Sequence, residues 1–203
     1  MAGRGRPRSF DRATALRQAM EVFWLRGYEA TSMTDLTSAM GIASPSLYAA
    51  FGSKERLFQE AVALYSATEG AAMTRAFTEE PTARAAVEAV LRENARVYAE
   101  QGRPSGCMIV LAATNCSAAN EPVREHLATW RRAGADMMAE RLDRAVAEGE
   151  LPAATDTRAA ADFYTTVIQG MSVQARDGAT AADLHKTVDR AMAAWDVVVV
   201  PPA

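Results

Sequence analysis

The run GYEATSMTDLTSAMGIASPSLYAAFGSKERLF, residues 27–58, holds two short helical patterns separated by a glycine. Ser32 stands three residues before Asp35, which is the spacing of a capping box at the start of a helix. The apolar positions that follow recur every three or four residues, and Gly41 ends the pattern after about two turns. We therefore expect a short helix from Ser32 to Met40.

A second short helix is expected just after this glycine. Ser44 is suited to be its N-cap, and Pro45 to be its first helical residue, where a missing N–H costs no hydrogen bond. Leu47 and Phe51 are four residues apart, so both face the core. Two short helices joined by a glycine turn are typical of a helix-turn-helix, whose second helix enters the major groove of DNA.

The rest of the chain also favours helices. Its apolar residues follow the helical period from Ser9 onward, and no window shows the strict alternation of a half-buried strand. Val197–Val200 resembles a strand but is better explained as the apolar end of the last helix. We expect an all-α protein of about nine helices, the others at 11–26, with Gly27 just past its end, 53 to about 73, 82–101, 107–117, 122–148, 157–176 and 181–197.

The composition is typical of a globular protein and excludes a membrane-spanning one. The 203 residues are 49% hydrophobic and 23% charged, as in ordinary globular domains. No apolar run approaches the ~20 residues that cross a bilayer, and no apolar stretch follows the charged start of the chain, so we expect a cytoplasmic protein without a membrane partner.

The net charge of −3 hides an asymmetry. Residues 1–58 carry eight Lys or Arg against five Asp or Glu, whereas residues 59–203 carry fourteen against twenty. Arginines are densest in residues 1–8, between glycines and a proline, where almost nothing can be buried. We expect this segment to be a disordered basic arm that places Arg6 or Arg8 in a minor groove of DNA.

Residues 9–65 resemble the DNA-binding domain of the TetR/AcrR family of transcriptional regulators. The likeness rests on the run quoted above, with its glycine turn, the SLYxxF pattern of the second short helix and the SKExLF pattern that follows it. The remaining two-thirds match the family only loosely. The resemblance implies a helix-turn-helix domain at 9–58 and a helical effector-binding and dimerisation domain at 59–203.

The resemblance also implies contacts with double-stranded DNA. Tyr48 lies next to an inward-facing leucine, so its hydroxyl points outward to a phosphate, although a half-buried ring that only packs is the alternative. Lys54 begins the next helix, where its ammonium and the free N–H groups bind a phosphate together. The other expected contacts are Thr31, Ser32, Thr34, Ser44, Pro45 and Ser46.

Direct base reading is expected to be modest. Residues 42–51 contain no Arg, Lys, Asn or Gln, the side chains that pair two-pronged with guanine or adenine. Ala50 also occupies a position where many family members carry histidine.

One short recognition helix reads too few base pairs for a unique site, so we expect a homodimer on a palindromic operator. Apolar stripes on the last two helices are suited to a four-helix interface, and protomer core is the alternative. The stripes consist of Tyr164, Val167, Ile168, Met171, Leu184, Val188, Met192 and Trp195.

The resemblance further implies a small apolar or amphipathic effector, bound among the central helices, that shifts the DNA-binding domains. Methionine and aromatic side chains suit such a pocket, although a helical core contains them too. The expected lining is Tyr98, Met108, Leu111, Trp130, Met137 and Phe163.

Two cysteines and two histidines are candidates for other chemistry. Cys107 and Cys116 on one helix would be half a turn out of phase and about 13 Å apart along the axis, which favours buried thiols over a disulfide. His126 and His185 have no ligand partners at metal-binding spacing, so we expect no metal and no cofactor.

The sequence thus favours a ligand-responsive transcriptional repressor. An enzyme is the rival class, but no phosphate-binding loop, nucleophile elbow or metal cluster is visible. A helical small-molecule-binding protein with a purely structural helix-turn-helix is the other alternative. The basic arm and Lys54 argue against it.

Overall fold

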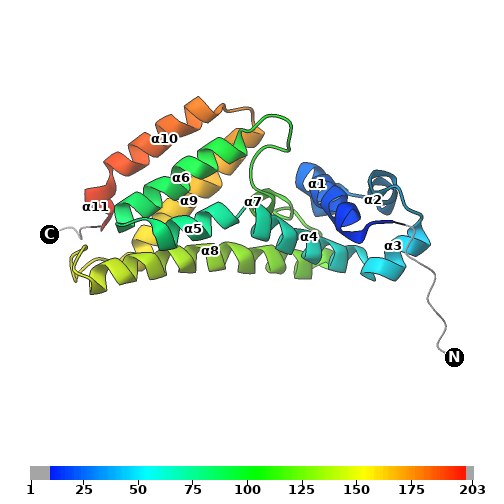
Figure 1. Cartoon of the computed structure of the whole chain (residues 1–203), viewed down its shortest axis with the longest axis horizontal. Coiled ribbons are helices and arrows are strands. Elements are labelled where there is room, and N and C mark those ends of the chain that lie inside the picture. The colour runs from blue at the N-terminus through cyan, green and yellow to red at the C-terminus, as the bar shows by residue number, and fades with distance from the viewer. Residues whose placement is uncertain (1–9, 200–203) are drawn as a thin grey trace.

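The computed structural model describes residues 10–199, and its regular structure in that range is entirely helical (Figure 1). This confirms the all-α prediction. The basic arm, with Arg6 and Arg8, lies outside the described residues. The helices are α1 (Arg12–Ala30), α2 (Met33–Met40), α3 (Ser44–Phe51), α4 (Lys54–Thr68), α5 (Ala71–Glu79), α6 (Ala83–Tyr98), α7 (Met108–Leu111), α8 (Glu121–Ala147), α9 (Thr157–Arg176), α10 (Ala181–Ala193) and α11 (Trp195–Val199), with a 3₁₀ turn at Ala118–Asn120.

The molecule is elongated, with the N-terminal helices at one end of its long axis and α10 and α11 at the other (Figure 1). Helix α1 packs on α2 and α4, while α6 packs on α5, α9 and α10. Buried apolar residues form one continuous cluster from α1 to α11. Helix α4 and the short α7 lie between the two ends. Within residues 10–199, no helix has the length and apolarity needed to span a membrane.

The N-terminal helices begin and end largely as predicted. The Ser32 hydroxyl accepts from the Asp35 N–H and the Asp35 carboxylate accepts from the Ser32 N–H, which completes the capping box. Gly41 takes the left-handed conformation that ends α2. Gly27, with φ of 76°, interrupts α1 as expected, but another turn follows it up to Ala30.

Other helix boundaries in the prediction are wrong. Ala43, and not Ser44, is the N-cap of α3, because the helix already includes Ser44 and no side chain caps it. Helix α4 ends at Thr68 rather than near Met73. A separate α5 follows Gly70, a residue with low helix propensity. The last predicted helix divides at Ala194.

The helix predicted at 107–117 has only four residues, Met108–Leu111. Two carbonyl groups, one in this helix and one at its C-cap Ala112, accept hydrogen bonds from other elements. Arg131 donates to Ile109 O at 2.9 Å, and the Tyr28 N–H donates to Ala112 O at 2.7 Å. The prediction fails here because long-range hydrogen bonds replace those that would extend the helix. Cys107 and Cys116 therefore do not share one helix, and both are free thiols.

The stripes assigned to a dimer interface lie in the core of the protomer. Helices α9 and α10 turn them toward α6 and toward each other, so all of them except the half-buried Val167 are closed to a partner. The helical period of these residues agrees with the prediction, but the exposed apolar stripe of α9 is a different one, with Phe163 and Val173. Val167 is half-buried, and the fully buried residues are Tyr164, Ile168, Met171, Leu184, Val188, Met192 and Trp195.

Candidate DNA-binding surface and ligand cavity

Helix α3 presents a polar, exposed side and an apolar, buried side. Leu47 and Phe51 are buried against the neighbouring helices, so they fix the orientation of α3. Tyr48 is 49% exposed, which confirms that its ring points outward rather than packing in the core. Ser44 and Pro45 are exposed beside it, and Ser46 is half-buried.

The start of α2 divides the predicted contact residues. Ser32 and Thr34 are exposed, although the Ser32 hydroxyl is engaged in the capping box. Thr31 is only 1% exposed, and its hydroxyl donates to Gly27 O at 2.6 Å. The prediction that Thr31 contacts DNA is therefore wrong. This side chain instead stabilises the turn between α1 and α2.

Lys54 is the first residue of α4, as predicted, and it is half-buried. Its Nζ lies 4.3 Å from the centre of the Tyr28 ring, a cation–π contact that holds the ammonium beside the helix N-terminus. Burial lowers the pKa of Lys54, and the negative charge of Glu29 opposes that shift. The arrangement places a cation next to free backbone N–H groups.

Arg12 supports this surface, and the sequence analysis missed its role. Its guanidinium donates to the Glu60 carboxylate at 2.6 Å and lies 4.4 Å from the centre of the Phe51 ring. These contacts tie α1 to α3 and α4. Nothing in the local sequence signals them, because Arg12 and Glu60 are 48 residues apart.

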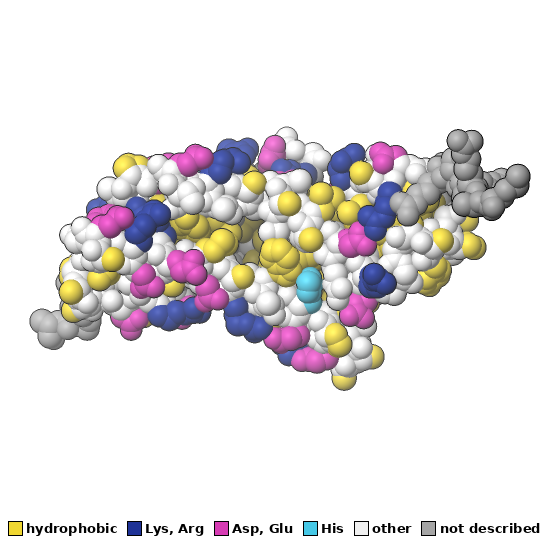
Figure 2. Space-filling model, turned by 60° about the horizontal axis from the view of Figure 1, so that its bottom comes forward, with side chains coloured by type: hydrophobic (Ala, Val, Ile, Leu, Met, Phe, Trp, Pro, Cys, Tyr) yellow, Lys and Arg dark blue, Asp and Glu magenta, His cyan; other side chains and the backbone are white. Residues whose placement is uncertain are grey.

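A mainly apolar cavity of about 300 Å³ lies among α4, α5, α6, α7, α8 and α9. Figure 2 shows apolar side chains gathered in a hollow between charged ones on this face of the molecule. Tyr98, Trp130 and Met137 line the cavity, as predicted for an effector site. Residues of α4 and α5, among them Tyr65 and Met73, line it too and were not predicted.

The other three predicted lining residues lie elsewhere. Met108 is fully buried in the core, and Leu111 packs near Gly106. Phe163 is 40% exposed on the outer side of α9. The prediction fails for these three residues because spacing along a helix shows which residues share a face. It does not show which other helix that face contacts.

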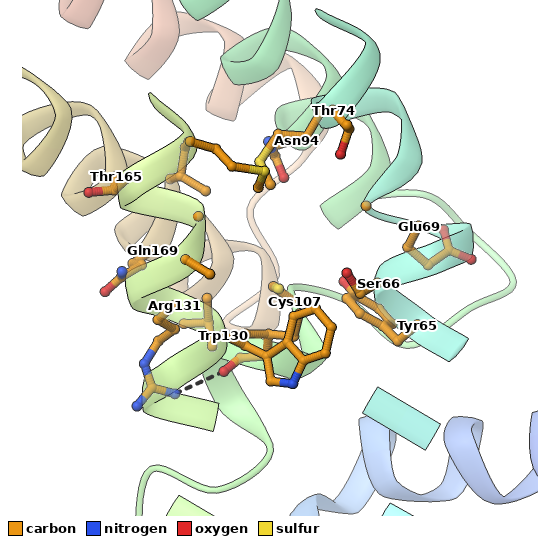
Figure 3. A pocket seen from close by; sticks show the side chains of 18 of the residues that line it. Tyr65, Ser66, Glu69, Thr74, Asn94, Cys107, Trp130, Arg131, Thr165 and Gln169 are labelled. Carbon is orange, nitrogen blue, oxygen red and sulfur yellow. Dashed lines mark hydrogen bonds between the residues drawn. The ribbon is translucent and has the colours of Figure 1, made fainter. Parts of the chain in front are cut away.

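Polar groups occupy both ends of the cavity. Thr74 and Asn94 lie at one end, and Tyr65, Cys107 and Trp130 lie together at the other (Figure 3). The Trp130 indole N–H donates to His126 Nε2 at 3.2 Å, on the turn before it. No group of three or more His, Cys, Asp or Glu side chains in residues 10–199 is placed to hold a metal ion.

Two structural links join this cavity to the N-terminal helices. Helix α4 begins at Lys54 and reaches the cavity with Tyr65 and Ser66. The segment around α7 forms the second link, because the Trp24 indole N–H donates to Gly106 O at 3.0 Å. The cavity wall is therefore in direct contact with α1 and includes part of α4.

Arg176, in the last turn of α9, strengthens the second link. It donates to Ser105 O at 3.1 Å and to Trp24 O at 3.0 Å. Burial lowers the pKa of this guanidinium. One side chain thus connects the cavity-side segment, the N-terminal helix and the C-terminal bundle.

Comparison with known proteins agrees with this arrangement. Residues 15–61 match the family model of bacterial regulatory proteins of the tetR family, and residues 83–195 match that of the tetracyclin repressor-like C-terminal domain. The chain is 33% identical to the HTH-type transcriptional repressor ComR of Escherichia coli over 197 residues, 97% of this chain and 94% of ComR.

Other similar proteins include BdcR of Escherichia coli, an HTH-type transcriptional repressor, with 30% identity over 90% of this chain and 88% of BdcR. Among solved structures, a cysteine mutant of the TetR family regulator CifR with 26-bp double-strand operator DNA has a TM-score of 0.92 and 46% identity. That match covers 94% of this chain and all of the CifR chain. The chain therefore belongs to the TetR family of bacterial regulatory proteins.

Proposed function

We propose that the protein is a ligand-responsive transcriptional repressor that binds a palindromic operator as a homodimer and is released by a small molecule in the cavity. The observation that carries this proposal is the surface at one end of the molecule, where α3 presents Tyr48 and α4 begins with Lys54. Supporting it, CifR was solved with operator DNA, and ComR and BdcR are named repressors. Because bacterial DNA is cytoplasmic, we place the protein there.

On DNA, α3 enters the major groove with Ser44, Pro45 and Ser46 toward the base edges. The Tyr48 hydroxyl donates to a phosphate, and Lys54 with the α4 N-terminus binds phosphate on the same side. Ser32 and Thr34 contact the backbone at the start of α2. Arg6 and Arg8 supply minor-groove contacts from the arm, whose structure is not described.

The dimer forms through the outer face of α9. Phe163 is 40% and Val173 46% exposed, and the half-buried Val167 and exposed Gly170 complete a stripe at three-to-four spacing. A glycine in such a stripe permits close approach of two helix axes. One face used by both protomers gives the two-fold symmetry that a palindrome requires.

The effector acts by shifting the equilibrium between two arrangements of the DNA-binding helices relative to the cavity. A ligand in the cavity contacts α4 at Tyr65 and the wall beside α7, and both elements reach the DNA-binding end. Only a ligand that fits one packing better than the other changes DNA affinity.

The test is binding to a palindromic fragment from upstream of the protein's own gene, measured by fluorescence anisotropy at several salt concentrations. We expect steep salt dependence and at least a thousandfold preference over scrambled DNA. Equal affinity for both duplexes would overturn the proposal and favour the helical binding protein as the alternative.

A further inference from the structure

A second, smaller cavity lies between α5 and α8, beside the apolar cavity described above. Its volume is about 240 Å³. Thr74 and Met137 line both cavities, so the two adjoin. The lining of the smaller cavity also includes two arginines of α8, Arg141 and Arg144. A compartment with positive charge therefore lies next to the apolar cavity.

Arg141 is the unusual residue of this second cavity. It is only 3% exposed, although arginine is among the residue types least often fully buried. Within the part of the chain that the structure describes, its Nε and Nη1 atoms have no hydrogen-bond partner and are closed to solvent. A buried guanidinium with unpaired donors destabilises the fold. An anion that accepted hydrogen bonds from it would remove that destabilisation.

Glu150 supplies only part of the missing negative charge. Its Oε2 lies 3.7 Å from Arg141 Nη2, beyond hydrogen-bond distance. Its Oε1 accepts from the Ala83 N–H at 2.6 Å, at the start of α6. Glu140 and Arg144 line the cavity too, but both are exposed, so water and salt screen their charges. Among residues 10–199, no carboxylate therefore lies within hydrogen-bond distance of the buried guanidinium.

We propose that the second cavity is a binding site for a carboxylate, which pairs with Arg141. A carboxylate accepts two parallel hydrogen bonds from a guanidinium, a geometry that a lysine ammonium does not offer. Because Nε and Nη1 are closed to solvent, the side chain turns toward the cavity that it lines when the ligand binds.

The two adjoining cavities suit a ligand with two parts. An acyl chain occupies the larger cavity, of about 300 Å³, and its carboxylate lies in the smaller one, past Thr74 and Met137. A small free carboxylate that fills only the second cavity has the same chemistry at Arg141. The inference rests on the proposed repressor function in one respect, namely that the bound carboxylate is the effector.

A binding role and a purely structural role for Arg141 predict different effects on stability. Arg141→Met keeps an unbranched side chain without the charge, and Glu150 stays hydrated because its side chain is 25% exposed. If Arg141 is present for a ligand, the ligand-free variant should melt at or above the wild-type temperature, since an incompletely paired buried charge is gone. A lower melting temperature combined with unchanged carboxylate binding would assign Arg141 a structural role and overturn the proposal.

The test measures the affinity of the full-length protein for octanoate, octan-1-ol and acetate by isothermal titration calorimetry. Wild type should bind octanoate at least tenfold more tightly than octan-1-ol, which lacks the charge. In Arg141→Met this preference should disappear, while octan-1-ol binding persists. Arg132→Met should keep the preference, because Arg132 is exposed on α8 and lines neither cavity. Acetate that competes as well as octanoate would identify a small free carboxylate as the ligand, and weak competition would identify an acyl chain.

Three outcomes would overturn the proposal: no octanoate binding, equal affinity for octanoate and octan-1-ol in wild type, or an unchanged preference in Arg141→Met. Should Arg141→Met fail to fold, Glu150→Gln decides the matter. It removes the negative charge beside the guanidinium and keeps an oxygen for the Ala83 N–H, so octanoate should bind more tightly. Unchanged or weaker binding to this variant would contradict the proposal.

The DNA readout separates this inference from the function on which it rests. Octanoate should weaken operator binding of the wild type at least tenfold and leave that of Arg141→Met unchanged. Octanoate binding without any effect on operator affinity would refute its role as effector. If the ligand-free protein binds no operator, the repressor proposal fails, and the calorimetry still decides whether the carboxylate site exists.

Discussion

The two ends of the molecule are specified in different ways. In the N-terminal four helices, the capping residues, the glycine turn and the buried apolar positions all lie within a few residues of the structure they specify. In the C-terminal domain, α9 has apolar residues on more than one side, and contacts far along the chain decide which side is buried. Local signals therefore describe the DNA-binding surface better than the cavity or the dimer face.

The largest expected effect is on stability, and it tests how much the C-terminal domain is stabilised by one long-range contact. Gly106 has φ of 76°, and a Cβ would lie 2.6 Å from Ser172 O. We expect Gly106→Ala to lower the free energy of unfolding by about 3–5 kcal/mol, from clash and backbone strain together. Urea denaturation measures this.

Gly102→Ala is the matched control for that variant. Gly102 also has a positive φ, of 84°, but a Cβ there meets nothing within 4 Å. It should lose only about 1 kcal/mol, the cost of the left-handed conformation alone. Equal losses in the two variants would show that the close approach to Ser172 has no energetic weight.

The outer face of α9 gives the next largest effect. A carboxylate at Phe163 in a symmetric interface places two buried charges together, so Phe163→Glu should weaken dimerisation about 100-fold. Analytical ultracentrifugation measures it. Val197→Glu is the control, because Val197 is 81% exposed on α11, outside this stripe. A Phe163→Glu protein that remains dimeric would place the interface elsewhere.

The chain's two lysines allow a sharp comparison between the ends. Lys54→Ala removes one charge-assisted phosphate contact and should weaken operator binding about 10- to 100-fold, with a shallower salt dependence. Lys186→Ala, in which the lysine is on α10 and pairs with Asp183 at 3.0 Å, should leave it unchanged. Equal losses would mean that Lys54 acts only through net charge.

The smallest effect concerns the capping box of α2. The Ser32 hydroxyl, the Ser32 N–H and Arg26 lower the pKa of Asp35 below its ordinary 3.8. Its contribution to stability is thus present above about pH 4 and is lost as the pH falls through the lowered value. Asp35→Asn should melt a few degrees below wild type at pH 7, and the gap should shrink at pH 3.

If the difference in melting temperature between wild type and Asp35→Asn stayed the same at both pH values, the negative charge of Asp35 would make no contribution to stability. Ser32→Ala is the companion variant. It should reduce the melting temperature at both pH values, because the N-cap hydroxyl does not titrate.

The same contrast between local and long-range contacts explains which features could be predicted from the sequence. The capping box, the glycine turn and the exposure of Tyr48 were all deduced from neighbouring residues. Thr31 was assigned to DNA because only the fold shows its hydroxyl turned to Gly27. Phe163 and Tyr164 are adjacent, and periodicity alone did not show that the first faces outward and the second the core.

The cavity shows the same limit. Three of the predicted residues line the cavity, because aromatic and methionine side chains on central helices favour such a position. The sequence relates Cys107 only to Cys116, on one predicted helix, whereas the observed helix spans only Met108–Leu111. Its neighbours Tyr65 and Tyr98 come from other helices, which no spacing rule brings together.

Gly27 has a consequence for how this protein can diverge. A Cβ at Gly27 would lie 3.1 Å from Ala112 O, the same carbonyl that accepts the Tyr28 N–H at 2.7 Å. Side chains such as Met73 and Met137 line the cavity without entering that joint. Substitutions at such cavity positions therefore leave this joint intact, whereas any side chain at Gly27 would strain the backbone and press on the Ala112 carbonyl.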